Sequence, residues 1–508
     1  MKKFLLLICF VAQFSATSQT QDLARLASGE YLGFNAVYDN NEELFGYVAL
    51  YGYGKSSDKT KKFEYVILDK NLNPVANNQF EGDITAADYY AYMDFRNNIV
   101  LRPSRIDYLS VKQKDLFTPS LMIINVKDNT ISKKTYYDFA DGAIKESFEN
   151  KNWNQERKEN KEEKKLKGYN YVSSVYEIKE GGFLVLEFND YGKYINNNSL
   201  IKLNEDRKEV WKYSYNKSGD KKNKVNFRLI DKDENYIYAF LNTEIEEDKK
   251  YELLIIDMKT GAEIKKVQIK KFNEKTLDEI SYLYSNNREI INQKTFDNKI
   301  VMVGVFYSGS NENLGFARLL IDKKTFEIDQ QAFLFSDLTS YLPNINRNGD
   351  LESGYKLSPR DLFFLSDGSV GVLTEKFKPY DGWTVEKSED LIYIYTDKDF
   401  KVKGTKVFDK EKSKYFTSDY LFSQYINEGK DVVFFYRDYQ KNKETKESNW
   451  KLFVNTLIDG KFNQEMIPMS LKNNFYISIY RAKEGFVLFQ EANYKEKQYK
   501  IRLEKMNY

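Results

Sequence analysis

The sequence contains the run Leu254-Ile255-Ile256-Asp257-Met258-Lys259-Thr260-Gly261, in which an apolar segment ends in a polar turn. A short apolar run of this kind, bounded by turn residues, is typical of a buried β-strand that enters a hairpin. The same pattern recurs along the chain, at residues 66–71, 122–129, 200–206, 319–324, 392–399, 453–460 and 499–504. The chain is therefore expected to consist of repeated β units.

An earlier apolar strand precedes the repeated run in most units, for example at residues 236–240, 369–373 and 431–435. Helical periodicity is scarce, and the units recur about every 60 residues, against about 40 to 50 for a plain four-stranded blade with short loops. We therefore predict an all-β protein, a β-propeller of about eight blades with long loops. A seven-bladed ring and two stacked β-domains are the alternatives.

The last unit ends before its outer strand, and an open edge of that kind is a liability in a β-sheet. Propellers remove it by closing the ring. We expect strands from both ends of the chain to complete one blade, with residues 31–38 supplying the N-terminal strand.

The WD and Gly-His signatures of WD40 repeats are absent, and double glycines of the kelch type do not recur in every unit. In its repeated apolar hairpins the chain resembles, in a general way, secreted β-propeller-like repeat proteins. The resemblance extends over nearly the whole chain after residue 18 and implies a fold but no activity.

The N-terminus has the pattern of a secretory signal peptide. Lys2 and Lys3 precede an apolar stretch from Phe4 to Phe14, and small residues follow. That stretch is shorter than the roughly 20 residues that span a bilayer. We expect residues 1–18 to be a signal peptide and residues 19–508 to form a single propeller-like domain that is periplasmic, at the cell surface or extracellular. No later segment reads as a transmembrane helix.

The chain has no histidine, and its only cysteine, Cys9, lies inside the expected signal peptide. Disulfides, Ser-His-Asp or Cys-His catalysis and typical zinc sites are therefore excluded for the mature chain. The 78 basic and 76 acidic side chains nearly balance, which argues against nucleic acid as a partner. No cofactor is expected.

A charge-dense segment at residues 143–167 interrupts the repeat. Its mixed charges are typical of a solvated helix or an excursion from the fold. A partner-binding arm is the alternative interpretation.

Loops that join the second and third strands of propeller blades converge on one face. In several units an acidic or amide residue stands beside tyrosine where the second strand ends. Aromatic rings stack on sugars or on peptide side chains, and carboxylates orient hydroxyl groups. The candidate ligand-binding residues are Glu187, Asp190, Tyr191, Glu375, Tyr380, Trp383, Arg437, Tyr439, Glu491 and Tyr494.

Residues 231–235, Asp-Lys-Asp-Glu-Asn, match the start of a calcium loop, but Tyr236 stands where such a loop needs glycine. We interpret the segment as a hairpin turn and predict no metal site.

Three functions remain open from the sequence. The first is a non-enzymatic binding or scaffold protein of the bacterial envelope that presents one propeller face to a protein or glycan partner. The second is a carbohydrate-active hydrolase, which needs two carboxylates about 5 to 10 Å apart. The third is a structural component of a surface assembly that uses the charged segment as its contact. The first is favoured because nothing marks two carboxylates as special, and the oligomeric state is not indicated.

Overall fold

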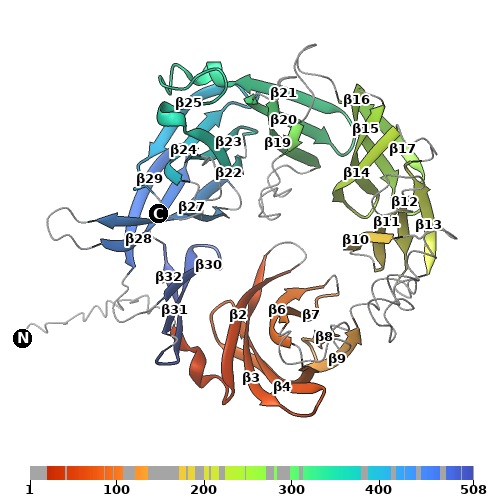
Figure 1. The fold of residues 1–508 in the computed structure, drawn as a ribbon, viewed down its shortest axis with the longest axis vertical. Coiled ribbons are helices and arrows are strands. Elements are labelled where there is room, and N and C mark those ends of the chain that lie inside the picture. Colours follow the sequence, from red (N-terminus) through yellow and green to blue (C-terminus); the bar gives the residue numbers. More distant parts are fainter. Residues whose placement is uncertain are drawn as a thin grey trace, which may run out of the picture.

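The protein is described by a computed structural model (Figure 1). The described residues are 20–39, 43–84, 86–94, 96–106, 120–135, 171–178, 181–188, 199–204, 208–216, 223–245, 248–269, 280–282, 298–307, 313–365, 367–378, 387–412, 419–427, 430–441, 448–469, 476–493 and 495–506. The expected signal peptide and the charged segment at 143–167 lie outside them.

The described residues form eight four-stranded antiparallel sheets. Seven of the sheets consist of four consecutive strands hydrogen-bonded in chain order. They are β2 (Glu30–Tyr38), β3 (Leu44–Lys55), β4 (Thr60–Asp69) and β5 (Pro74–Asp83); β6 (Ala86–Met93), β7 (Ile99–Ile106), β8 (Ser120–Asn125) and β9 (Thr130–Thr135); β10 (Tyr171–Glu177), β11 (Phe183–Phe188), β12 (Ser199–Leu203) and β13 (Glu209–Ser214); β14 (Asn223–Lys232), β15 (Tyr236–Ile245), β16 (Asp248–Asp257) and β17 (Glu263–Gln268); β18 (Ile280–Tyr282), β19 (Lys299–Tyr307), β20 (Asn313–Asp322) and β21 (Ile328–Leu334); β22 (Lys356–Phe364), β23 (Val370–Lys378), β24 (Lys387–Thr396) and β25 (Val402–Phe408); and β26 (Tyr420–Ile426), β27 (Asp431–Lys441), β28 (Ser448–Ile458) and β29 (Lys461–Met469).

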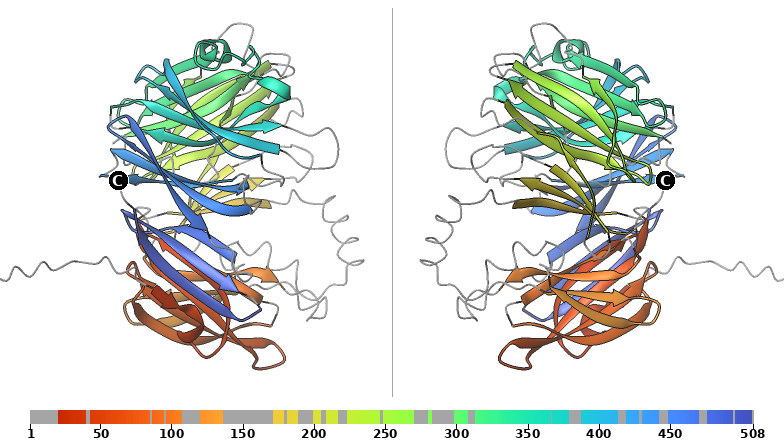
Figure 2. Two further views of the ribbon diagram at one scale, coloured as in Figure 1. Left: turned by 90° about the vertical axis from the view of Figure 1, so that its left-hand side faces the viewer. Right: turned by 90° about the vertical axis from the view of Figure 1, so that its right-hand side faces the viewer.

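The eight sheets follow one another around a common axis, as the blades of a β-propeller do (Figure 1). The first strand of a sheet, such as β10 or β22, lies nearest the axis, and the fourth, such as β13 or β25, lies at the rim. Side views show the strong twist within each sheet (Figure 2), which is the ordinary twist of β-strands. The predicted fold is confirmed with eight blades.

The ring closes in a sheet that contains both ends of the chain. Strand β1 (Thr20–Asp22) pairs with β32 (Gln498–Lys505), which continues through β31 (Phe486–Asn493) to β30 (Tyr476–Arg481). Closure by both termini is confirmed, but the expectation that residues 31–38 supply the closing strand was wrong, because they belong to β2 of the next sheet.

The physical reason is a short 3₁₀ turn, η1 (Leu23–Arg25), that separates β1 from β2. Its Leu23 is fully buried and packs in a cluster with Leu488 and Ile501. The hydroxyl of Tyr51 donates to the Leu23 carbonyl at 2.6 Å. Three residues before this turn are enough to cover the edge of β32.

The hydrophobic core is divided among the seams between neighbouring sheets. Seven clusters of buried side chains each join two adjacent sheets, for example Leu391 and Phe408 with Val432 and Phe434 between β22–β25 and β26–β29. Apolar runs buried on both sides explain why the second and third strands lack the alternation of a half-exposed strand. Two further 3₁₀ turns, η5 (Phe335–Leu338) and η6 (Glu352–Gly354), cover one seam between β21 and β22.

The aspartates that end the repeated apolar runs hold the turn to the fourth strand. Oδ1 of Asp257 accepts from the backbone N–H of Thr260 at 2.7 Å, and Oδ1 of Asp322 accepts from that of Thr325 at 3.0 Å. These backbone hydrogen bonds lower the pKa of both aspartates, so each turn is held by an ionised carboxylate at neutral pH. Asp69 and Asp397 also accept from backbone N–H groups of their own turns, those of Asn71 at 2.8 Å and Lys401 at 2.9 Å, and this shared role explains the recurrence of aspartate here.

Among the described residues no helix combines the length and apolarity needed to cross a membrane.

Candidate functional site

Four of the ten predicted site residues have described side chains. They are Glu375, Arg437, Tyr439 and Glu491. Asp190, Tyr191, Tyr380, Trp383 and Tyr494 lie outside the described residues, and of Glu187 only the backbone in β11 is described. For these six residues a role in ligand binding remains a prediction.

β-Bulges place Glu375 and Arg437 at equivalent positions in neighbouring sheets. The pairing of β22 with β23 skips Arg360, and that of β26 with β27 skips Leu421. The residue before each bulge pairs with Thr374 in the first sheet and with Tyr436 in the second. Glu375 and Arg437 are the residues that directly follow these two partners. Glu187 stands one position earlier in its sheet, opposite the residue before the bulge, so the recurrence of glutamate does not extend to it.

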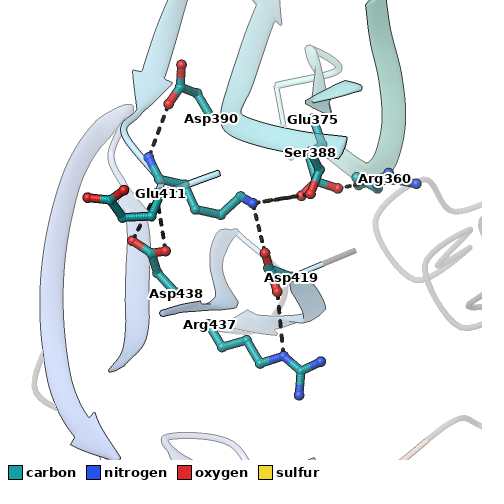
Figure 3. A network of polar contacts seen from close by, with 9 residues as sticks. Arg360, Glu375, Ser388, Asp390, Glu411, Asp419, Arg437 and Asp438 are labelled. Carbon is teal, nitrogen blue, oxygen red and sulfur yellow. Dashed lines mark hydrogen bonds and ion pairs between the residues drawn. The ribbon is translucent and has the colours of Figure 1, made fainter. Parts of the chain in front are cut away.

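Lys410 connects these two positions. Its Nζ lies 2.8 Å from Asp419 Oδ2, 3.4 Å from Glu375 Oε1 and 3.3 Å from Ser388 Oγ. The bulge at Arg360 turns that side chain so that its Nε donates to Glu375 Oε2 at 2.6 Å. Figure 3 shows these partners meeting at the seam between the two sheets.

The network continues to Arg437, whose backbone N–H donates to the Asp419 carbonyl at 2.9 Å and whose Nε lies 3.7 Å from Asp419 Oδ1. The side chains of Lys410 and Glu375 are fully buried and that of Asp419 is 6% exposed. Burial raises the pKa of the Asp419 carboxyl, and the neighbouring Lys410 and Arg437 oppose that rise. The seam therefore holds charges that have little access to water.

The backbone around Lys410 is fixed by two further carboxylates. The Lys410 N–H donates to Asp390 Oδ1 at 3.1 Å, and the Glu411 N–H donates to both oxygens of Asp438, at 3.2 and 3.3 Å. Asp390 also pairs with Lys376 at 2.8 Å. The backbone at Lys410 and Glu411 is thus held by carboxylates of both sheets.

An aromatic pair lies next to Arg437. Tyr439 on β27 stands directly opposite Trp450 on β28, with ring centroids 5.1 Å apart. The Arg437 guanidinium lies 5.0 Å from the centre of the Trp450 ring, within range of a cation–π interaction. Tyr439 is 48% exposed. We call Arg437, Tyr439 and Trp450 the aromatic patch.

Sequence reasoning missed Lys410, Asp419 and Trp450. Lys410 lies in the sequence Asp409-Lys410-Glu411-Lys412, which has the composition of a solvated linker. Nothing local distinguishes the buried lysine from the exposed Lys412. Trp450 could have been predicted from the sequence, because the register of a long hairpin formed by the second and third strands places Trp450 opposite Tyr439.

Glu491 belongs to a different sheet. It stands opposite Ile477 in a pairing of β30 with β31 that has no bulge, and Arg502 Nε donates to its Oε1 at 3.2 Å. The described carboxylates among the predicted residues, Glu375 and Glu491, are thus both engaged by cationic side chains.

The segment at residues 231–235 comprises the end of β14 and the turn to β15. Oδ1 of Asp233 accepts from the N–H groups of Asn235 and Tyr236, at 3.0 and 2.9 Å. Lys323 from the next sheet lies 2.7 Å from Asp231 and 3.5 Å from Asp233. The carboxylates of the calcium-like motif therefore pair with a lysine. Among the described residues no group of three or more acidic side chains is arranged to hold a metal ion.

A buried acid in the same seam makes stability depend on pH. Asp361 is 2% exposed and accepts hydrogen bonds from the Tyr420 hydroxyl and the Leu362 N–H. Burial raises the pKa of Asp361 to about 7, against the lowering effect of these hydrogen bonds. Between about pH 4 and pH 7 the folded protein holds a proton that the unfolded chain releases, so folding becomes less favourable as the pH rises through this range.

We expect Asp361→Asn to abolish this dependence, because the amide stays neutral and still accepts the Tyr420 hydrogen bond. Relative to the variant, the wild type should lose a few kcal/mol of unfolding free energy between pH 4 and pH 7. Urea unfolding of both proteins at pH 4, 5.5 and 7 measures the difference. Parallel pH profiles would contradict the assignment.

Comparison with known proteins identifies no family for this chain. No protein-family model matches the chain, and no curated protein matches its sequence. The WD40 domain of SCAP from fission yeast is 8% identical, with 82% of this chain and 92% of that chain covered and a TM-score of 0.25. The β-propeller domain of the Trilobed protease from Pyrococcus furiosus is 9% identical, with 88% and 98% covered and a TM-score of 0.31. An ulvan lyase of polysaccharide lyase family PL25 is 9% identical, with 82% and 91% covered and a TM-score of 0.37.

The solved structures include a WD40 domain, a propeller domain of a protease and a lyase. The described residues of the chain form an eight-bladed β-propeller.

Proposed function

We propose that the protein is a non-enzymatic binding or scaffold protein that presents the end of the propeller bearing the aromatic patch to a protein or glycan partner. The observation that carries this proposal is the half-exposed Tyr439, whose ring packs against Trp450 near the strand ends that border the second-to-third-strand loop. Arg437 lies over the same Trp450 ring. Aromatic side chains that are fixed before binding supply contact area at low entropic cost.

The state of the carboxylates supports binding over hydrolysis. A glycosidase needs one carboxylic acid and one carboxylate that both reach the substrate. Glu375 is buried beneath Arg360 and Lys410, and Glu491 is paired with Arg502. The described residues of the predicted face thus offer an aromatic contact surface with neutralised charges.

We further propose that residues 1–18 direct export and are removed, so that the protein acts in the periplasm, at the cell surface or outside the cell. The charged start and short apolar stretch support this part of the proposal.

The test compares tagged wild type with Tyr439→Ala in pull-downs from envelope extracts and on a glycan array. Tyr395→Ala is the matched control, because Tyr395 is similarly exposed (40%). It lies near the last residue of the third strand β24, at the end of that strand away from the second-to-third-strand loop. We expect Tyr439→Ala to weaken partner binding at least tenfold, about 1.4 kcal/mol, as loss of an interface aromatic does. Tyr395→Ala should bind like the wild type.

Equal binding by wild type and Tyr439→Ala would contradict the proposed surface, and glycan cleavage by the purified protein would contradict the non-enzymatic assignment. N-terminal sequencing of the protein recovered from the envelope fraction should begin at Gln19. A first residue of Met1 would contradict the proposed export.

A further inference from the structure

The seam between sheets β22–β25 and β26–β29 brings an amine and two carboxyl groups together out of contact with water. Lys410 Nζ is 2.8 Å from Asp419 Oδ2 and 3.4 Å from Glu375 Oε1, and all three side chains are at most 6% exposed. We propose that Lys410 and Asp419 become joined by an intramolecular isopeptide bond, with Glu375 as the catalytic residue.

Exclusion of water is the first condition for this reaction, which joins a neutral amine to a protonated carboxyl. Two opposite charges that have lost their hydration are stabilised by moving one proton from the ammonium to the carboxylate. The raised pKa of Asp419 has the direction this transfer requires. The aromatic neighbours Phe408, Tyr420 and Tyr436 are buried in the same seam and keep its polarity low.

Proximity supplies the second condition. Lys410 is fixed through its backbone by Asp390, and Asp419 is fixed by its carbonyl bond from the Arg437 N–H. The two reacting groups are therefore held in contact by the fold, which removes most of the entropic barrier to a bimolecular reaction.

The step balances without any further reactant. The Lys410 Nζ lone pair attacks Asp419 Cγ, and the C=O electrons move to one carboxyl oxygen. The Glu375 carboxylate accepts a proton from the attacking nitrogen and returns it to the leaving hydroxyl group. The C–O bond breaks, water leaves, and an amide joins Nζ to Cγ.

The two arginines of the network have positions that suit this step. Arg360 binds Glu375 Oε2 and leaves Oε1 facing the lysine amine, so the proton acceptor is oriented toward the attacking nitrogen. Arg437 Nε lies beside Asp419 Oδ1, the oxygen remote from Lys410, where negative charge develops in the tetrahedral intermediate. A permanent salt bridge is the alternative state of the same groups.

Mass spectrometry of the wild-type chain from Gln19 to Tyr508 separates these two states. We expect the denatured protein to be lighter than its sequence by one water molecule. Trypsin normally separates Lys410 from Asp419, since Lys412 and Lys414 lie between them. In the linked protein it should instead release one cross-linked species that contains both residues. A full-length mass with separate peptides would overturn the proposal.

Variants assign the roles. Glu375→Gln is expected to restore the missing water, because the amide cannot accept the proton. Lys410→Arg replaces the amine with a guanidinium group that does not form the amide. This variant still tests the proposal if Glu375→Gln does not fold. Lys412→Met is the matched control and should keep the cross-link, since Lys412 pairs with Glu389 at the surface. Loss of water that persists in Lys410→Arg would place the dehydration elsewhere and overturn the assignment.

Discussion

Lys410→Met is expected to destabilise the protein by about 3 to 5 kcal/mol, because it removes the amine that neutralises Asp419, either as an ion pair or through the amide proposed above. Glu375 and Asp419 are then buried side by side as free carboxyl groups. The two arginines do not replace it. Arg360 reaches only the far oxygen of Glu375, and Arg437 stays 3.7 Å from Asp419. The unfolding free energy from urea titration at pH 7 measures the loss.

Lys412→Met is the matched control. Lys412 lies two residues away, is half-exposed and pairs with Glu389 at 2.9 Å. Solvent screens such a pair, so its loss should cost less than about 1 kcal/mol. Adding Glu375→Gln and Asp419→Asn to Lys410→Met should recover part of the lost stability, since the buried charges then disappear together. A Lys410→Met protein as stable as the Lys412→Met protein would show that the seam does not depend on this network.

Removal of residues 20–25 is expected to have the second large effect. The deletion takes away β1, which covers the edge of β32, and Leu23, which fills a core cluster between the first and last sheets. Loss of a buried leucine side chain alone costs about 2 to 5 kcal/mol. The exposed edge of β32 should in addition favour association between chains.

Urea unfolding and size-exclusion chromatography compare this deletion with a chain that begins at Thr20. We expect the deletion variant to unfold at a lower urea concentration and to elute partly as oligomers. Coincident unfolding curves would show that the N-terminal strand contributes nothing to the ring.

The repeat could be predicted because it rests on strong local signals. Apolar runs that end in aspartate, such as the run that ends at Asp257, predict a buried strand. The aspartate also predicts the turn that its carboxylate stabilises. The closing strand was misassigned because β1 is only three residues long and carries no apolar alternation, whereas residues 31–38 read as a longer strand. Its place depends on contacts of Leu23 with residues near the other end of the chain.

The site could be predicted only in part, because burial of charge is decided by tertiary packing. Glu375 and Arg437 were recognised from their place at the end of a second strand, and the bulge register makes those places equivalent. Their common partner Lys410 comes from a linker whose composition resembles any solvated segment. A bulge at Arg360 shifts the side-chain alternation by one residue, and no local pattern in Ser358-Pro359-Arg360-Asp361 reports it.

The most direct measurement of the closed eight-bladed ring is disulfide formation between Thr20→Cys and Arg502→Cys in a chain that starts at Gln19 and so contains no other cysteine. Thr20 and Arg502 face each other in the register of β1 and β32, and antiparallel partners have Cα atoms about 4.5 to 5.5 Å apart, within disulfide range. Thr20→Cys with Lys461→Cys, an exposed position on the outer strand β29 of the neighbouring sheet, is the control. The closed ring predicts a monomer with an intramolecular disulfide and a raised unfolding midpoint for the first pair only. Free thiols, or disulfides only between chains, in the Thr20–Arg502 pair would contradict it.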